Sequence, residues 1–269
     1  MISATEITRW VAGMAGALDR WVRIAGTGAS FAFFGVGSLV LGLIAFPILA
    51  AVSWNETNRQ MRMQRLIHHS FRVFEAFMKA VGVIAVAVPA PERFPKRGPC
   101  LVIANHPTLL DYVLLVAQMP QADVVVKKAY WSNPVTAGVV RGAGYIPNDT
   151  GEATVEECVR RIEAGRIVLL FPEGTRSPRG GLGRFQRGAA HVALATGGRA
   201  LPVTVTCEPP GLMRGQPWYD VPERRMQYTF DAGEPIVAAP DGEPRGRASR
   251  SLTAAYREHF EKRLGNTDG

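Results

Sequence analysis

The feature that most limits how this chain can fold is a long stretch without charge near its beginning. No Asp, Glu, Lys or Arg occurs from Ile24 to Asn55, and residues 30–52 are mostly apolar or small. Such a stretch exceeds the roughly 20 apolar residues that an α-helix needs to cross the hydrocarbon core of a bilayer. It is also too long for the apolar part of a signal peptide. We therefore expect an apolar, membrane-embedded helix over about residues 28–54.

Two geometries are open for this apolar helix. Gly42 and Pro47 are compatible with a tilted helix that spans the bilayer or a kinked helix that enters and leaves on one face. Arginines lie on both sides of the stretch, at positions 20, 23, 59 and 62. The positive-inside rule therefore does not select between these geometries. A buried core helix is the third possibility, and the length of the uncharged stretch disfavours it.

An amphipathic pattern predicts a second helix over about residues 57–87. Apolar side chains recur at helical spacing along one side, namely Met63, Leu66, Ile67, Phe74, Phe77, Met78 and Val81. Basic side chains and a histidine occupy the opposite side, namely Arg62, Arg65, His69, Arg72 and Lys79. A basic stripe suits anionic headgroups, although the solvated face of an ordinary helix has the same pattern. The two helices together predict an N-terminal membrane anchor over residues 1–88.

The whole chain is basic, with 31 Lys and Arg against 23 Asp and Glu and a formal net charge of +8. This balance favours an anionic partner, which is either nucleic acid or an anionic membrane. The aromatic and basic patterning of RNA-binding modules is absent, so we expect a membrane and no nucleic acid. Three widely spaced cysteines (Cys100, Cys158 and Cys207) form no disulfide framework or metal-binding spacing and suit a reducing cytoplasm.

Residues 89–99 contain four prolines and are expected to form an extended linker. Beyond it, strand and helix patterns alternate, which is typical of an α/β domain with mostly parallel strands. Strands are expected near residues 100–104, 123–127, 144–146, 166–171, 201–206 and 225–231. Helices are expected near 109–118, 133–142, 152–164, 186–196 and 247–264. The sequence therefore predicts an α/β catalytic domain over residues 100–269, with a mixed, largely parallel sheet flanked by helices.

Local signals delimit the expected helix near residues 152–164. Asp149 and Glu152 have the spacing of a capping box at its start, and Gly165 suits the left-handed position after its end.

The first segment that suggests chemistry is Asn105-His106-Pro107-Thr108-Leu109-Leu110-Asp111, directly after the expected strand 100–104. Pro107 disfavours a helical conformation at His106, so we expect His106 in a turn and Asp111 in a helix that opens near Thr108. If Asp111 accepts the Nδ1 proton, Nε2 is free to take a proton from a hydroxyl group. A surface histidine on a capped strand–helix turn is the alternative.

A second polar loop, Pro172-Glu173-Gly174-Thr175-Arg176-Ser177, follows the expected strand 166–171. Ligands of α/β proteins gather at the carboxyl ends of strands. Gly174 lets backbone N–H groups approach a ligand, and the Arg176 guanidinium suits a phosphate. The two loops together predict one shared site.

These two segments resemble the signature blocks of the glycerolipid acyltransferases, the family that contains 1-acylglycerol-3-phosphate acyltransferase. Weaker blocks fit in the same order, at residues 144–147, 185–188 and 201–205. The likeness extends from about Pro99 to Pro210. It implies a membrane-bound O-acyltransferase that moves a fatty acyl group from an acyl thioester to a hydroxyl of a lysophospholipid. By default it would convert 1-acylglycerol-3-phosphate to phosphatidic acid.

The resemblance also implies roles for individual residues. His106 would be the general base, and Asp111 would orient it. The second loop would bind the polar end of the acceptor and stabilise developing negative charge, through Glu173, Gly174, Thr175 and Arg176. Lys128 and Arg187 are further candidate anion contacts. The donor would be acyl-CoA or acyl carrier protein, no cofactor or metal is implied, and the catalytic domain would face the cytoplasm from the inner membrane.

In one place the chain departs from the family's pattern. Members with phosphate acceptors usually have an arginine after the block at 144–147, where this chain has Asn148 and Asp149. Arg141 is a candidate substitute, and another hydroxyl-bearing lipid or a polyene-type product is an alternative acceptor. A lipid hydrolase is disfavoured because no Gly-x-Ser-x-Gly motif occurs. A non-catalytic membrane scaffold is disfavoured because both signature blocks are intact.

Overall fold

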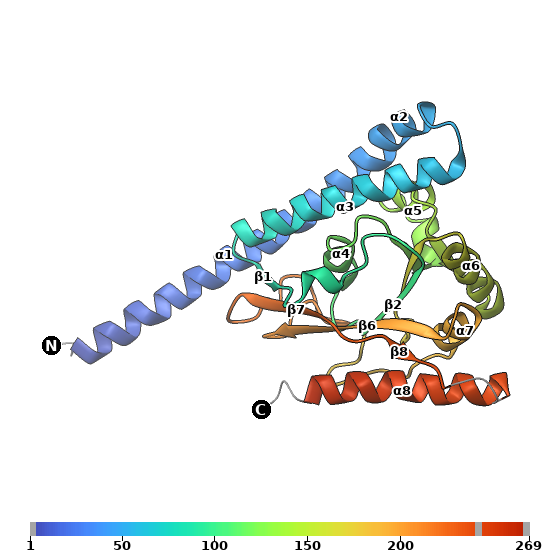
Figure 1. The fold of residues 1–269 in the computed structure, drawn as a ribbon. Helices are drawn as coiled ribbons and strands as arrows, with labels where there is room; N and C mark the ends of the chain where they lie inside the picture. Colours follow the sequence, from blue (N-terminus) through green and yellow to red (C-terminus); the bar gives the residue numbers. More distant parts are fainter. Residues whose placement is uncertain (1–3, 240–243, 266–269) are drawn as a thin grey trace.

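An eight-stranded sheet lies at the centre of the computed structural model, which describes residues 4–239 and 244–265 (Figure 1). Its strands are β1 (Ile84–Ala87), β2 (Cys100–Ala104), β3 (Asp123–Lys127), β4 (Ile146–Asn148), β5 (Ile167–Leu170), β6 (Arg199–Glu208), β7 (Met226–Ala232) and β8 (Ile236–Val237). The strand order is β1-β7-β6-β2-β5-β3-β4, with β8 paired to β6. The pairs β6–β7 and β6–β8 are antiparallel and the other pairs are parallel. The expected mixed, largely parallel sheet is confirmed.

Helices cover both faces of the sheet (Figure 1). The helices are α1 (Ala4–Val40), α2 (Phe46–Ala51), α3 (Glu56–Ala80), α4 (Asp111–Val116), α5 (Ala137–Gly142), α6 (Gly151–Glu163), α7 (Gly188–Ala195) and α8 (Arg245–Gly265). On one face the core cluster joins Phe71 of α3 to Leu114 of α4 and Val203 of the sheet. On the other face Cys158 of α6, Val192 of α7 and Phe260 of α8 form a second cluster. The sheet therefore separates two apolar cores.

The N-terminal helix begins well before residue 28, where the sequence predicted its start, because α1 already includes Ala4. It passes through a π-helical turn, η1 (Leu41–Ala45), and continues directly into α2. Pro47 has no N–H to donate to the preceding turn, and a π-turn is one way in which a helix accommodates this loss. The Phe46 N–H donates to the carbonyl of Leu41 instead.

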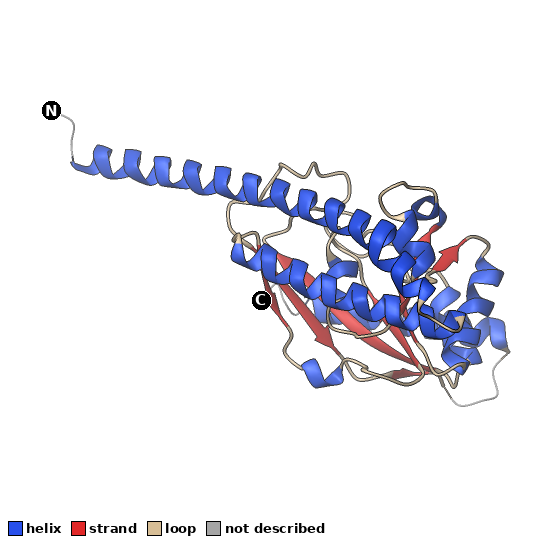
Figure 2. Cartoon of the chain, turned by 90° about the horizontal axis from the view of Figure 1, so that it is seen from above, coloured by secondary structure: helices blue, strands red, loops and turns tan. Residues whose placement is uncertain are grey.

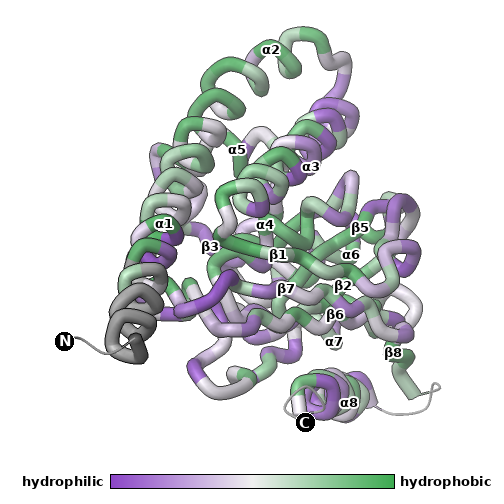
Figure 3. The backbone as a smooth tube through the Cα atoms, turned by 90° about the vertical axis from the view of Figure 1, so that its left-hand side faces the viewer, coloured by the Kyte–Doolittle hydropathy of each residue, from purple (hydrophilic) through white to green (hydrophobic). Residues whose placement is uncertain are grey.

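This N-terminal helix is long and apolar enough to cross a membrane between Leu18 and Ala51, by length and composition. Only 17% of its most apolar window is buried in the protein. In Figure 2 its first turns extend beyond the rest of the fold, and Figure 3 shows its hydrophobic colouring continuing into α2. Most of the apolar helix surface is therefore available to an apolar environment outside the protein.

The second helix is shorter than predicted, and the expectation of a helix to residue 87 is wrong. α3 ends at Ala80, where Gly82 takes a left-handed conformation (φ +76°). The Gly82 N–H donates to Lys79 O (3.2 Å) and the Val83 N–H to Met78 O (3.0 Å), which is the Schellman arrangement. The next residues form β1, which pairs with the distant β7. Residues 84–87 therefore belong to the sheet.

The apolar side of α3 packs against the protein, as Met63, Ile67 and Phe74 are buried. The opposite side is exposed, including Arg62, Arg65, His69, Arg72 and Lys79. The helix is also fixed by polar contacts, which the sequence pattern did not predict: Gln64 Nε2 donates to Asp123 Oδ1 (3.0 Å), and Asp123 accepts from Arg161 (3.0 Å). α3 is thus both the neighbour of α1 and a wall of the α/β fold.

Other boundaries differ slightly from expectation. β4 begins at Ile146 and not near 144, and α4 and α5 are shorter at one or both ends. The predicted capping box is wrong, because Thr150 is the N-cap of α6 and the Asp149 carboxylate accepts a hydrogen bond from Lys128 (2.7 Å). The predicted left-handed glycine after α6 is confirmed at Gly165 (φ +77°).

Candidate active site

His106 and Asp111 lie together at the carboxyl end of β2. His106 is in the loop that follows the strand, and Asp111 is the first residue of α4. The distance from His106 Nδ1 to Asp111 Oδ2 is 2.8 Å. The Asp111 side chain is fully buried, whereas the imidazole is 19% exposed. If the carboxylate accepts the Nδ1 proton, Nε2 is left without a proton on the more accessible edge of the ring.

Thr108 and Tyr228 fix the position of the Asp111 carboxylate. The Thr108 N–H donates to Asp111 Oδ2 (2.7 Å) and its hydroxyl to Oδ1 (2.5 Å). The Thr108 hydroxyl in turn accepts from the buried Tyr228 hydroxyl on β7 (3.0 Å). Three hydrogen bonds thus reach the carboxylate, one of them from His106, and the Thr108 hydroxyl also accepts from the Leu110 N–H (3.2 Å). Such a network prevents rotation of the carboxylate and keeps the imidazole in one orientation.

Glu173 joins the two predicted loops from within the protein. Its Oε1 accepts from the backbone N–H of His106 (3.2 Å) and from the Ser177 hydroxyl (2.6 Å). Its Oε2 accepts from the Gly183 N–H (2.6 Å). Glu173 is 5% exposed. Because both oxygens already have internal donors, this carboxylate holds the backbone that carries His106.

A large cavity of about 810 Å³ borders His106. It arises where β3 leaves its neighbour: Asp123 and Val124 pair with β5, while residues 125–127 pair with β4. Side chains from both sides of this divergence line the cavity, among them Val126 of β3 and Leu170 of β5. The cavity therefore lies between β3 and β5, at the point where these two strands stop pairing with each other.

The cavity has apolar walls on both faces of the sheet. On the side of the N-terminal helices it is lined by Phe31, Phe34, Phe71, Phe74, Met78 and Val113. On the other side it is lined by Val155 and Cys158 of α6 and by Ala189 and Val192 of α7. Burial raises the pKa of the Cys158 thiol to about 12, so this thiol remains protonated near neutral pH and is a poor nucleophile.

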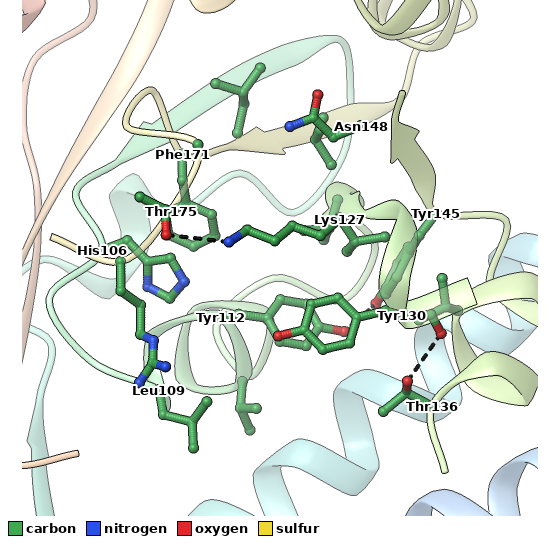
Figure 4. Close-up of a pocket in the computed structure, with 18 of the residues that line it drawn as sticks. His106, Leu109, Tyr112, Lys127, Tyr130, Thr136, Tyr145, Asn148, Phe171 and Thr175 are labelled. Atoms are coloured by element: carbon green, nitrogen blue, oxygen red, sulfur yellow. Dashed lines mark hydrogen bonds between the residues drawn. The ribbon is translucent and has the colours of Figure 1, made fainter. Parts of the chain in front are cut away.

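Aromatic rings shape the part of the cavity near His106. The imidazole stacks on Phe171, with ring centroids 4.3 Å apart. Tyr112 and Tyr145 meet through their hydroxyls (3.1 Å), and desolvation raises the pKa of both phenols. Figure 4 shows the rings of Tyr112 and Tyr145 on the opposite side of the cavity from Thr175, with the Lys127 side chain extending between the tyrosines and Thr175. The phenols therefore remain neutral hydrogen-bonding groups in an apolar wall.

Four cationic side chains border the cavity, namely Lys127, Arg176, Arg187 and Arg214. Arg176 donates to the carbonyls of Leu212 and Met213 (3.3 Å each), and Lys127 donates to the Thr175 hydroxyl (3.3 Å; Figure 4). Gly174 and Thr175 border the same cavity. The structure thus brings most of the second loop, together with Arg187, around the cavity that contains His106.

Two predicted cations lie elsewhere. Lys128 is exposed and forms an ion pair with Asp149 (2.7 Å), while its neighbour Lys127 borders the cavity. Arg141 is exposed on α5 and does not border the cavity. The sequence offered no signal for Arg214, which lies in the loop between β6 and β7 and outside every signature block. Among the residues that the structure describes, no cluster of His, Cys, Asp and Glu suits a metal ion.

The loop between β6 and β7 folds back onto the His106 loop. The Leu109 N–H donates to Leu212 O (3.1 Å), and Thr108 and Met213 form an isolated antiparallel β-bridge. A tight turn follows, in which the Gln216 N–H donates to Met213 O (3.1 Å) and Gly215 has a φ of +77°. Glycine is the residue that such a turn requires at this position. The turn presents Arg214 at the edge of the cavity.

Comparison with known proteins finds similarity over the region that contains this site. The model of the acyltransferase family matches residues 85–206, which include both loops. A chloroplastic 1-acyl-sn-glycerol-3-phosphate acyltransferase from Brassica napus is 27% identical over 54% of this chain and 44% of its own length. The alpha form of the mouse (Mus musculus) enzyme of the same name is 28% identical over 72% of this chain and 65% of its own length.

Among solved structures, the 1-acyl-sn-glycerophosphate acyltransferase PlsC from Thermotoga maritima has a similar fold. The TM-score is 0.61 and the sequence identity 17%, with 88% of this chain and 97% of that chain covered. The matched family region contains both loops of the candidate site, and over this region the chain is similar to the acyltransferase family and to the 1-acyl-sn-glycerol-3-phosphate acyltransferases.

Proposed function

We propose that this protein transfers a fatty acyl group from an acyl thioester to a hydroxyl of a lysophospholipid at a membrane. The default acceptor is 1-acylglycerol-3-phosphate, with phosphatidic acid as the product. The observation that carries the proposal is the His106–Asp111 pair, at 2.8 Å, on the border of an 810 Å³ apolar cavity. An imidazole held in this way is suited to deprotonate a hydroxyl, and the cavity can exclude water from a fatty chain.

The reaction follows from the position of the imidazole. His106 Nε2 takes the proton of the acceptor hydroxyl while the hydroxyl oxygen attacks the thioester carbonyl carbon. The negative charge of Asp111 stabilises the imidazolium that forms. The carbon–sulfur bond then breaks, and the imidazolium returns its proton to the departing thiolate. We assign Glu173 a positioning role for the His106 backbone, in place of direct contact with the acceptor, because its oxygens accept internal hydrogen bonds.

The acceptor phosphate is assigned to Arg176 and Arg214. Both border the cavity, and Arg176 also holds the carbonyls of the turn that presents Arg214. Guanidinium groups suit a phosphate, because each can donate a pair of hydrogen bonds to its oxygens. Arg214 would thus replace the cation that this chain lacks at Asn148 and Asp149.

The membrane supplies the acceptor to this site. We propose that α1 and α2 enter the bilayer of the inner membrane and that the catalytic domain faces the cytoplasm. Trp218, on the same loop as Arg214, lies against Phe31 of α1, with ring centroids 6.2 Å apart. Tryptophan rings favour the membrane–water interface. The arginine turn would therefore lie near the depth of lipid headgroups.

The proposal is tested with purified protein in lipid vesicles that contain a labelled acyl thioester and a panel of hydroxyl lipids. We expect labelled phosphatidic acid when 1-acylglycerol-3-phosphate is supplied. Replacement of Arg214 by Ala removes charge-assisted contacts, so we expect the KM for this acceptor to rise about 10- to 100-fold. The matched control, Arg141→Ala, leaves this KM unchanged because Arg141 does not border the cavity.

Other products would contradict particular parts of the proposal. Labelled free fatty acid in place of an acylated lipid would identify a hydrolase. Transfer to neutral hydroxyl lipids in preference to the phosphate-bearing lipid would contradict the assigned acceptor. An unchanged KM in Arg214→Ala would remove Arg214 from the phosphate site.

A further inference from the structure

A second concave site lies beside the catalytic cavity, on the face of the sheet that carries α7 and α8. This depression, of about 490 Å³, is bordered by the four arginines Arg184, Arg187, Arg250 and Arg257, together with Phe185, Thr253 and Ala254. None of these seven described residues is acidic. Cavities of this size commonly hold small molecules. We call this site the arginine depression.

Three of the four guanidinium groups have no partner among the residues that the structure describes. Among the described residues, Arg184, Arg187 and Arg250 make no side-chain hydrogen bond or ion pair, whereas Arg257 donates to Gly183 O (3.2 Å) and pairs with Glu261 (2.7 Å). Arginines gathered without acidic partners repel one another, which costs stability. A polyanionic ligand would relieve this repulsion and occupy the unused donors.

Arg187 connects the depression to the catalytic cavity, because this residue borders both. It is the residue directly before α7, whose Ala189 and Val192 line the cavity. A ligand with phosphates in the depression could therefore extend past Arg187 towards His106. A molecule that occupied both the depression and the cavity would have an anionic end, a flexible arm and a reactive group at the end of that arm.

The depression lies away from the proposed membrane anchor. Figure 1 shows α8 below the sheet, while α1 and α3 lie above it. Lipid headgroups of the proposed membrane would therefore lie on the opposite face of the sheet from the arginine depression. The natural occupant is a water-soluble molecule that enters from the aqueous side.

On the basis of the proposed function, we infer that the arginine depression binds the phosphates of coenzyme A, the carrier half of an acyl-CoA donor. The nucleotide end of coenzyme A bears a 3′-phosphate and a pyrophosphate, and its pantetheine arm carries the acyl thioester. A small concave site with several guanidinium groups fits a compact phosphate cluster, because planar guanidinium forks bind phosphate oxygens in pairs. The acidic helix of an acyl carrier protein would need a broader surface.

The test measures binding without turnover. Full-length His106→Ala protein in detergent is titrated with coenzyme A, and again after Arg184→Ser and Arg250→Ser are introduced together. We expect the Kd for coenzyme A to rise about tenfold or more, since two charge-assisted contacts are lost. The matched control is Arg247→Ser, an exposed arginine on α8 that does not border the depression. It should leave the Kd unchanged.

Dephospho-coenzyme A separates phosphate recognition from other contacts. Dephospho-coenzyme A should bind the His106→Ala protein more weakly than coenzyme A does. This difference in Kd between the two ligands should be smaller in the protein that also carries Arg184→Ser and Arg250→Ser. An unchanged Kd for coenzyme A in that protein would overturn the inference. Loss of acyl carrier protein binding while coenzyme A binding persists would also overturn it, in favour of a protein-docking surface. Either result leaves acyl transfer itself intact, so the proposed function would survive.

Discussion

At the scale of single residues, the site depends on one carboxylate whose position is fixed on every side. Asp111 is fully buried and accepts hydrogen bonds from the Thr108 N–H, the Thr108 hydroxyl and the His106 imidazole. A rigid acceptor leaves the imidazole with one favourable tautomer, which has its free nitrogen at Nε2. This fixed geometry is what the proposed role of His106 as a base requires.

Replacement of Asp111 by Asn tests this explanation. The amide retains the size of the carboxylate but can donate a proton towards Nδ1, which favours the wrong tautomer. We expect kcat to fall about 10³- to 10⁴-fold while the KM for the donor changes little. The matched control, Asp231→Asn, removes a partly exposed carboxylate that pairs with Arg263 (3.2 Å), and it should retain the wild-type rate. Steady-state kinetics on both variants would decide, and a nearly unchanged kcat in Asp111→Asn would refute the tautomer argument.

At the scale of elements, the cavity exists because β3 diverges from β5 and because α5 is held against the N-terminal helix. Gly138 of α5 and Gly42 of η1 approach so closely that a Cβ on Gly138 would lie 3.0 Å from the Gly42 Cα. The next residues of α5, Val139 and Val140, line the cavity. The glycine contact therefore sets the distance between the anchor and the cavity wall.

A larger residue at position 138 should separate these helices. We expect Gly138→Val to destabilise the protein by about 1–3 kcal/mol, because added atoms would clash with the η1 backbone. The Tm in detergent should fall, and acyl transfer should decrease. Gly35→Val is the control, since a side chain at Gly35 of the same N-terminal helix meets nothing within 4 Å. Equal Tm values for the two variants would contradict the close helix contact.

The elements also show what the sequence alone could predict. Buried apolar runs predicted β2, β3 and β5, and the two loops that follow β2 and β5 contain the candidate site. β1 was missed because helical periodicity continues to Val81, while its partner β7 is distant in the chain. Spacing could not distinguish Lys127 from Lys128. Arg214 could not be predicted, since its position depends on a loop that folds back onto Leu109.

At the scale of the whole molecule, lipid and water-soluble substrates would approach from opposite faces. The exposed apolar helix and the basic side of α3 lie on one face, and α8 lies on the other (Figures 1 and 3). The divergence of β3 and β5 gives the cavity apolar walls on both faces of the sheet. In the proposed function, such an architecture allows an acceptor from the bilayer and a donor from the aqueous side to meet at His106.

The basic side of α3 should contribute to membrane affinity. We expect the double variant Arg65→Glu and Arg72→Glu to bind anionic vesicles at least about tenfold more weakly, because each cation near such a surface contributes about 1 kcal/mol. Its folding should be unaffected, since both side chains are exposed. Vesicle flotation at low and high salt provides the measurement. The control is the charge reversal of Arg245 and Arg247 on α8, and equal losses for both pairs would contradict the proposed orientation.

The most direct test of the whole account is the rate of acyl transfer in a His106→Ala variant, with the exposed His69→Ala variant of α3 as the control. Purified proteins in identical vesicles would receive a labelled acyl thioester and 1-acylglycerol-3-phosphate. We predict a fall of about 10²- to 10⁴-fold in phosphatidic acid formation for His106→Ala, with membrane binding retained, and no change for His69→Ala. Phosphatidic acid formed by His106→Ala at the wild-type rate would contradict the assignment of this imidazole as the base.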